Sequence, residues 1–239
     1  MWRPLPARHW CWDVTFLPGQ VQGRWFYLFL ILDLYSRKVV GFEVHDTDKA
    51  EHAAHLARRT ALAEGIHAGP VRPVLHGDNG ASLKGTTVLA MLHWLGIQPS
   101  HSRPRVSDDN AFAEALFRTA KYRPEFPNSG FATLDEARQW AARFVRWYNQ
   151  EHRHSGIRYV TPAQRHAGQD GPMLAARHAL YQRARESHPR RWSGRTRNWT
   201  PIGPVTLNPE REALVQAALS APQLSRSASL QSNAPKPAE

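Results

Sequence analysis

The sequence predicts an α/β protein whose mixed five-stranded sheet carries helices on both faces, with a small C-terminal extension. Three observations lead to this prediction. Three strand-like segments come first and are joined by short connections, as in an antiparallel meander. Helical and strand-like segments then alternate, which is typical of strands connected through helices. After about residue 155 the chain becomes basic and aromatic, which indicates a separate extension.

The first three strands differ in their pattern. His9–Leu17 alternates, so that four apolar side chains share one face and Asp13 lies on the other. Trp25–Leu32 is continuously apolar, as a central strand covered on both faces would be. Val39–Val44 follows a short turn and completes the meander.

The hydrophobic period then changes to that of helices. Gly65 and Gly96 end two of the helical segments, and Asp108 is a capping candidate for a third. Thr133 and Glu136 stand at the spacing of a capping box. The predicted helices are Asp48–Glu64, Ser82–Leu95, Asp108–Tyr122 and Thr133–Glu151, and the predicted strands between them are Val71–Leu75 and Ile97–His101.

We predict a catalytic-core domain over residues 1–155, an extension over 156–209 and a disordered tail over 210–239, which is rich in Ser, Ala, Pro and Gln. The extension should contain helices around Pro162–His166 and Met173–Glu186.

A basic aromatic stretch follows these helices, and it mixes guanidinium groups with the indoles of Trp192 and Trp199. Such a surface can bind phosphates and stack on unpaired bases. The alternative is a tail that packs both tryptophans back on the core. The candidate DNA-binding residues of this stretch are Arg190, Arg191, Arg195 and Arg197.

The net charge of +11 favours a polyanionic partner, although an arginine-rich codon bias is the alternative explanation. The single cysteine, Cys11, excludes an intrachain disulfide and fits a reducing cytoplasm. The N-terminus has no signal-peptide pattern, and the longest apolar run is too short to span a bilayer. We therefore expect a soluble cytoplasmic protein that does not enter membranes.

Three carboxylates are candidates for chemistry. Asp13 interrupts an aromatic strand, where a carboxylate is rare unless paired or bound to metal, although a solvated edge is the alternative. Asp78 ends a short apolar strand, but Asp-Asn-Gly is also a good turn sequence. Glu114 shares a helix face with Arg118 and Lys121, which could form only a surface ion-pair ladder.

Taken together, the three carboxylates are more specific than each alone. Two strand residues and one helix residue could converge on one cleft, where they would repel each other without a cation. Oxygen ligands with open coordination positions suit Mg²⁺ or Mn²⁺.

Several segments of the chain resemble the integrase core of bacterial insertion-sequence transposases, in the branch whose second reading frame resembles retroviral integrase. Thirty-five residues separate Asp78 from Glu114, as in that family, and Lys121 is the basic residue expected seven positions after the glutamate. The similarity runs from about residue 9 to about 209. The segments that carry it are Trp10–Thr15, Leu32–Arg37, His76–Gly80, Ser107–Glu114, Trp147–Asn149, Thr161–Ala163 and Trp192–Trp199.

The resemblance implies an RNase H-like fold and a polynucleotidyl transferase that cleaves and transfers DNA strands at insertion-sequence ends. Asp13, Asp78 and Glu114 would hold two Mg²⁺ or Mn²⁺ ions, and Arg118 and Lys121 would contact DNA phosphates. The implied partners are double-stranded DNA and further copies of the chain on it.

Two departures from the family pattern matter. Gly77 stands where serine is more common. Family members also carry helical DNA-binding segments upstream of the core, so we expect a truncated copy or one piece of a split element, with an upstream-frame helix-turn-helix protein as a further partner. The alternatives are a nuclease of the same fold and an inactive remnant that only binds DNA.

Overall fold

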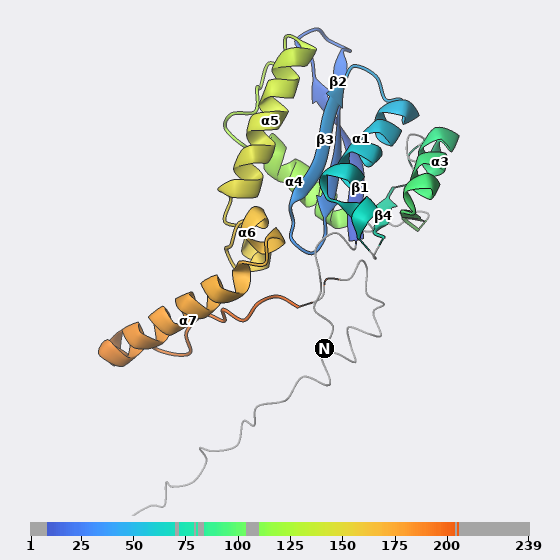
Figure 1. Cartoon of the computed structure of the whole chain (residues 1–239). Helices are drawn as coiled ribbons and strands as arrows, with labels where there is room; N and C mark the ends of the chain where they lie inside the picture. Colours follow the sequence, from blue (N-terminus) through green and yellow to red (C-terminus); the bar gives the residue numbers. More distant parts are fainter. Residues whose placement is uncertain are drawn as a thin grey trace, which may run out of the picture. The chain divides into compact units, whose positions relative to one another are not determined.

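The structure is a computed structural model, which describes residues 9–69, 72–78, 80, 84–103, 110–203 and 205. Its centre is a five-stranded sheet with the order β3-β2-β1-β4-β5 (Figure 1). The first three strands pair antiparallel, whereas β4 is parallel to β1 and β5 is parallel to β4, so the predicted mixed sheet is confirmed. The strands are β1 (His9–Pro18), β2 (Trp25–Asp33), β3 (Val39–His45), β4 (Val74–Gly77) and β5 (Gln98–His101).

Strand β2 is continuously apolar because both of its faces are buried. Its side chains alternate between two hydrophobic clusters. Leu28 and Leu30 point into one cluster, whereas Phe29 and Ile31 point into the other. This arrangement explains why the period-two alternation of β1 is absent from β2.

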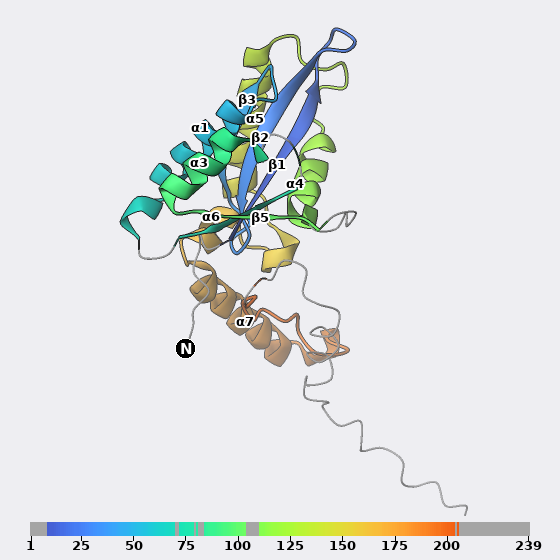
Figure 2. The same cartoon turned by 90° about the vertical axis from the view of Figure 1, so that its right-hand side faces the viewer.

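Each face of the sheet is covered by a pair of helices, as Figures 1 and 2 show. One cluster contains apolar residues of α1 and α3 together with Trp10 and Trp12 of β1. The other contains residues of α4 and α5 together with Cys11. The helices are α1 (Ala50–Ala63), α3 (Thr86–Leu95), α4 (Ala111–Lys121) and α5 (Leu134–Gln150).

Helix α1 crosses β3 closely at Gly41. A Cβ atom on Gly41 would lie 2.0 Å from the hydroxyl oxygen of Thr60 and 3.2 Å from a methyl carbon of Leu56. Real Cβ atoms do not approach other atoms this closely, so the contact between strand and helix requires glycine here.

Several predicted boundaries differ from the structure. Strand β4 ends at Gly77, two residues after the predicted Leu75, and its buried His76 has its ring Nδ1 3.0 Å from the Ser100 hydroxyl. Helix α3 begins at Thr86, and its predicted start, Ser82, lies outside the described residues. Helix α4 begins at Ala111 after the N-cap residue Asn110, while the predicted cap Asp108 lies outside the described residues.

The extension after α5 contains three short segments and one longer helix, which begins at Asp170 and not at the predicted Met173. Thr161 and Gln164 form a capping box at the start of α6. The segments are η3 (Ser155–Ile157), α6 (Pro162–His166), α7 (Asp170–Ser187) and η4 (Pro189–Arg191). The described residues lie in one compact unit, and the boundary near residue 155 stays a prediction. The predicted disordered tail, 210–239, lies outside the described residues.

A chain of polar contacts joins α6 to the core. The Ser36 hydroxyl donates to Asp33 at 2.6 Å, and its oxygen lies 3.0 Å from His166 Nδ1. The other nitrogen of His166 lies 2.9 Å from Glu64, at the end of α1. Asp33 also accepts the Ser36 backbone N–H at 2.7 Å, which caps the turn between β2 and β3.

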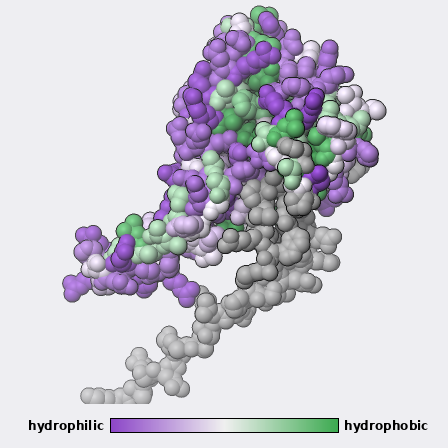
Figure 3. All heavy atoms as spheres, in the orientation of Figure 1, coloured by the Kyte–Doolittle hydropathy of each residue, from purple (hydrophilic) through white to green (hydrophobic). Residues whose placement is uncertain are grey.

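The face in Figure 3 is mainly hydrophilic, with smaller hydrophobic patches. In the part of the chain that the structure describes, no helix is both long and apolar enough to cross a bilayer.

The close contact at Gly41 generates a stability prediction. We expect Gly41→Ala to lower the free energy of unfolding by about 1–3 kcal/mol, the usual cost of forcing an extra methyl group into a packed interior. Thr60→Ala should cost less, because the buried Thr60 hydroxyl has no hydrogen-bond partner among the described residues. The double variant should regain most of the loss, because the clashing oxygen is gone.

Urea denaturation of the four proteins measures this coupling. Gly171→Ala is the matched control, because a Cβ atom there meets nothing within 4 Å. Equal losses in Gly41→Ala and in the double variant would contradict the proposed contact.

Candidate active site

The register between β1 and β4 aligns two of the candidate carboxylates. The two strands pair in parallel with Trp10 opposite Leu75 and Cys11 opposite His76. Continuing the register by two residues places Asp13 opposite Asp78. Neighbouring strands lie about 4.8 Å apart, and residues in register share a face of the sheet. The sheet therefore directs both carboxylates to the same place, where β4 ends.

Asp78 also has a role in the turn. Its carboxylate accepts the backbone N–H of Gly80 at 3.0 Å, as the turn interpretation of the sequence expected. The two roles are compatible, because this bond occupies Oδ1 and leaves Oδ2 available. The intervening residue, 79, lies outside the described residues.

Glu114 is carried by α4, whose first turn is attached to β1. The Asn110 side chain donates through Nδ2 to the main-chain oxygen of Trp12 at 3.0 Å. Glu114 is exposed and lies one turn after Asn110, on the same face of the helix. Since Trp12 directly precedes Asp13, this contact brings the face with Glu114 toward the strand that carries Asp13.

Asp13 has a strongly perturbed carboxyl group. Burial is the largest cause and raises its pKa to about 7, while a hydrogen bond from the Val14 N–H at 2.8 Å acts in the opposite direction. The charges of Asp78 and Glu114 raise the pKa further, and Lys121 lowers it. All three candidate carboxylates thus interact electrostatically around Asp13.

The donor chemistry of this cluster suits a hard divalent cation. Carboxylate oxygens are the ligands that Mg²⁺ and Mn²⁺ prefer, and a cation would favour the ionised form of Asp13 against its burial and the neighbouring charges, which raise its pKa. Among the described residues, which include Asp13, Asp78 and Glu114, no group of three or more His, Cys, Asp or Glu side chains is gathered closely enough to hold a metal ion, so the convergence of the three carboxylates on one metal cluster stays a prediction. Residues 79, 81–83 and 104–109, which flank Asp78 and precede α4, lie outside that description.

Two cations lie further along the same face of α4. Arg118 and Lys121 follow Glu114 at four and seven positions, and both are exposed. In the described part of the chain neither forms an ion pair, so the predicted alternative of a salt-bridge ladder on this helix is not what the structure shows. The Arg118 guanidinium lies 5.7 Å from the ring of the exposed Tyr122.

The tryptophans of the extension pack internally. Trp199 is buried with Ile157, Val160 and Leu174 in a small hydrophobic cluster. The ring of Trp192 lies 5.9 Å from that of Tyr181. Trp199 therefore packs within the extension and not on the core of the sheet, and its buried ring is not a free platform for bases, whereas Trp192 is half-buried beside Tyr181.

The four candidate arginines of the extension divide into two groups. The Arg197 guanidinium lies 5.0 Å from the Tyr159 ring and 5.7 Å from the Trp199 ring, so it contributes to the packing. Arg190, Arg191 and Arg195 are exposed and form no ion pair within the described residues.

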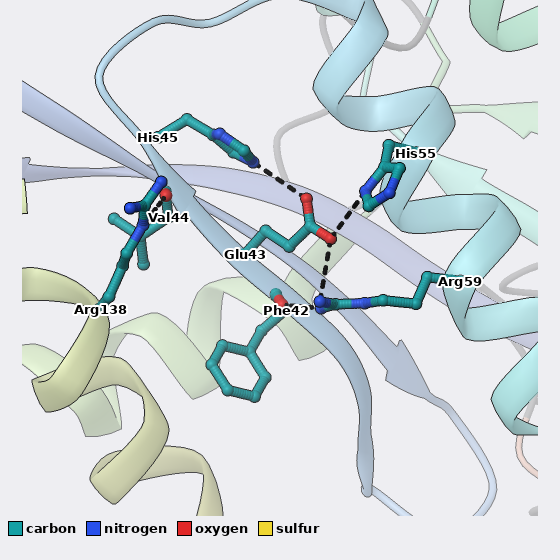
Figure 4. A pocket seen from close by; sticks show the side chains of 7 residues that line it. All are labelled: Phe42, Glu43, Val44, His45, His55, Arg59 and Arg138. Carbon is teal, nitrogen blue, oxygen red and sulfur yellow. Dashed lines mark hydrogen bonds and ion pairs between the residues drawn. The ribbon is translucent and has the colours of Figure 1, made fainter. Parts of the chain in front are cut away.

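A separate cavity of about 350 Å³ lies along the edge strand β3. Figure 4 shows Glu43 at its centre, with contacts to His45 at 2.9 Å, His55 at 3.1 Å and Arg59 at 3.2 Å. None of the three candidate carboxylates lines it. The lining residues are Phe42, Glu43, Val44, His45, His55, Arg59 and Arg138.

Two arginines of this cavity bind the free edge of the sheet. Arg59 of α1 donates to the main-chain oxygen of Phe42 at 2.6 Å, and Arg138 of α5 donates to that of Val44 at 3.1 Å (Figure 4). These bonds satisfy carbonyl groups that an edge strand leaves without a neighbour. We therefore assign this cluster to the stability of the sheet edge.

Comparison with known families gives two matches, both described as integrase core domain. Residues 3–107, which include Asp13 and Asp78, match the first, and residues 95–162, which include Glu114, match the second. Together the two matches extend from residue 3 to residue 162.

Curated relatives carry the same signal. The chain is 28% identical over 158 residues to a transposase for insertion sequence element IS904 of Lactococcus lactis, covering 66% of this chain and 60% of the relative. It is 26% identical over 163 residues to the putative transposase InsK for IS150 of Escherichia coli, covering 66% and 54%. A putative transposase for IS986/IS6110 of Mycobacterium tuberculosis is 27% identical over 168 residues, with 67% and 58% covered. The chain thus spans less than two thirds of the length of these relatives.

A solved structure has the same fold. A chain of the simian T-cell lymphotropic virus intasome, in complex with PP2A regulatory subunit B56 gamma, superposes with a TM-score of 0.50 at 15% identity. The match covers 70% of this chain and 56% of that chain. It confirms the predicted RNase H-like fold.

The environment of Asp13 predicts a pH-dependent stability. In the unfolded chain an aspartate has a pKa of about 3.9, whereas in the fold the pKa of Asp13 is raised to about 7. Between these values the unfolded chain releases a proton that the folded chain keeps, so stability falls as the pH rises from about 4 to about 7. We expect Asp13→Asn to stabilise the metal-free protein at pH 8 and to change little at pH 4.

Urea midpoints of both proteins in EDTA across this pH range test the expectation. Asp46→Asn, at an exposed site, is the control and should show no such trend. A stability difference between wild type and Asp13→Asn that stays constant with pH would argue against the buried, repelled carboxylate.

Proposed function

We propose that this chain is the catalytic core that cleaves and transfers DNA strands in a transposase. It belongs to the integrase-core family of insertion-sequence transposases, because residues 3–162 match integrase core domains and the curated relatives are transposases. The observation that carries the proposal is the attachment of the three carboxylates to one strand. The parallel register of β1 and β4, continued by two residues, sets Asp13 opposite Asp78, and the hydrogen bond from Asn110 to the Trp12 oxygen attaches the helix of Glu114 to β1.

In this proposal Asp13, Asp78 and Glu114 hold two Mg²⁺ or Mn²⁺ ions. Such ions activate the attacking oxygen and stabilise the leaving oxygen of a phosphodiester exchange. Asp13, on the central strand β1, would bind the ions together with Asp78 and Glu114. The nucleophile is water in donor cleavage and a DNA 3′-hydroxyl in strand transfer.

Arg118 and Lys121 would hold DNA phosphate beside this site. They lie on the face of α4 that carries Glu114, they are exposed, and no described carboxylate neutralises them. A phosphate held there would bring the scissile bond to the carboxylates, and such positioning is a large part of catalysis.

Arg190, Arg191 and Arg195 would bind the DNA backbone at a second place. Since Trp192 and Trp199 are engaged in packing, the binding is to phosphate and carries no base stacking. The substrate is double-stranded DNA at transposon ends and target, the chain acts as a homo-oligomer on it, and an upstream-frame helix-turn-helix protein supplies end recognition. The proposed location is the cytoplasm, with DNA.

The catalytic assignment predicts loss of activity on removal of any one carboxylate. Asp13→Asn, Asp78→Asn and Glu114→Gln should each lower Mg²⁺- or Mn²⁺-dependent DNA cleavage at least about a hundredfold, because metal stabilisation of the transition state is worth several kcal/mol. Cleavage of duplexes that carry the element's own ends measures this, with joined products separating a transposase from a nuclease.

Glu151→Gln, at an exposed carboxylate after α5, is the matched control and should cleave as the wild type does. Variants of the three carboxylates should still bind DNA. Undiminished cleavage by Glu114→Gln would refute the catalytic assignment.

The phosphate-binding assignment predicts a steep salt dependence. If about five phosphates are neutralised, the logarithm of the association constant for DNA should fall with the logarithm of the salt concentration, with a slope of about −4 to −5. Replacing Arg190, Arg191 and Arg195 together by alanine should make the slope shallower by about 2.7, or about 0.9 for each lost contact.

Fluorescence anisotropy with a labelled duplex at several salt concentrations gives the slope. Arg58→Ala, at an exposed position of helix α1 in the core domain, should leave the slope unchanged. A slope that is the same in the triple variant would exclude these arginines from the interface.

A further inference from the structure

We infer that Asn110 is a positioning residue for Glu114, because its amide fastens the first turn of α4 to the main chain of β1 beside Asp13. The inference rests on the proposed metal site and concerns how its helix-borne ligand is held. In the sequence, Asn110 is one residue of the Ser107–Glu114 segment, with no role predicted for it.

The Asn110 side chain is directed to the strand and not to its own helix. Asparagine at an N-cap position usually accepts a hydrogen bond from the second or third N–H of the helix. Asn110 is the N-cap residue of α4, with φ −123°, but makes no such bond. Its Nδ2 donates instead to the Trp12 oxygen at 3.0 Å, and its buried Oδ1 has no partner among the described residues.

This exchange has an energetic cost. A buried oxygen without a partner and a helix start without a side-chain cap each destabilise the fold by about 1 kcal/mol or more. The contact with β1 persists in spite of both, so the placement of α4 against this strand is strongly constrained. Unsatisfied buried groups of this kind are rare in folded proteins.

The geometry connects the contact to the site. Trp12 and Asp13 are consecutive in β1, and Asn110 and Glu114 are one helical turn apart on the same face. The hydrogen bond from Asn110 to Trp12 therefore links the residue before Asp13 to the residue one helical turn before Glu114.

The remaining described contacts of α4 are mainly apolar. Its apolar side buries Ala113, Leu116, Phe117 and Ala120 in the core, and the ring of Phe112 lies 3.7 Å from the Arg37 guanidinium. Apolar packing of this kind is non-directional, and two of the four residues are alanines, whose small side chains interlock little. A buried hydrogen bond is directional, so the amide of Asn110 can set where along β1 the helix begins.

A second asparagine attaches a helix to a strand in a similar way, on a helix that carries none of the proposed metal ligands. Asn149 of α5 accepts the Val39 N–H at 2.9 Å and donates to the Val39 oxygen at 2.9 Å. It attaches a helix to a strand through the same amide chemistry, but α5 holds none of the three carboxylates. Asn149→Ala therefore shows the effect of losing a helix–strand attachment alone, without any effect on the placement of Glu114.

The test is Mn²⁺ binding by the whole chain without DNA, followed through the electron paramagnetic resonance signal of free Mn²⁺. We expect Asn110→Ala to weaken Mn²⁺ binding about tenfold, as loss of a group that orients a ligand does. Asn110→Leu, which keeps the branched shape but lacks the donor and leaves no cavity, should weaken it similarly. Asn149→Ala should lower the melting temperature yet bind Mn²⁺ as the wild type does.

Asp13→Asn tests the metal site separately from the positioning role of Asn110. If it abolishes Mn²⁺ binding while both Asn110 variants bind as the wild type does, the positioning role is wrong and the metal site stands. Weakening in Asn149→Ala equal to that in Asn110→Ala would also overturn the inference, because general loosening would then explain both. If the wild type binds no Mn²⁺, the proposed metal site fails and the inference fails with it.

Discussion

The parallel pairing of β1 with β4 is the constraint on which the candidate site depends. It places the middle of β1 beside the end of β4, and the same register, continued by two residues, sets Asp13 opposite Asp78. A shift of one residue in this register would turn one side chain to the opposite face of the sheet. The buried clusters on both faces of β1 resist such a shift, so the packing of the core also sets the alignment of Asp13 with Asp78.

Gathering carboxylates in this way opposes folding, and the chain offsets the effect only in part. The Val14 N–H and Lys121 favour the ionised form of Asp13, whereas burial and two neighbouring acids disfavour it more strongly, and its pKa is raised to about 7. The fold therefore keeps a locally unfavourable charge arrangement that binding of a cation would relieve. Functional sites are commonly less stable than the scaffold that holds them.

The sequence was sufficient for the order of strands and helices, because alternation in β1 and continuous burial in β2 are local patterns. It could not settle long-range choices. Whether Trp199 stacks on DNA or packs internally depends on Ile157, Val160 and Leu174, which are distant in the chain. The predicted cap of α4, Asp108, lies outside the described residues, whereas the N-cap residue of the described helix, Asn110, is held by a strand about a hundred residues away.

The arginines that bind the edge carbonyls of β3 have a consequence for colloidal behaviour. An open strand edge recruits strands from other molecules, and the carbonyls of Phe42 and Val44 would otherwise offer such an edge. The opposite edge, β5, contains Pro99, which has no N–H to donate. Bonded carbonyls at one edge and a proline at the other therefore lower the tendency of separate copies of this chain to pair edge to edge.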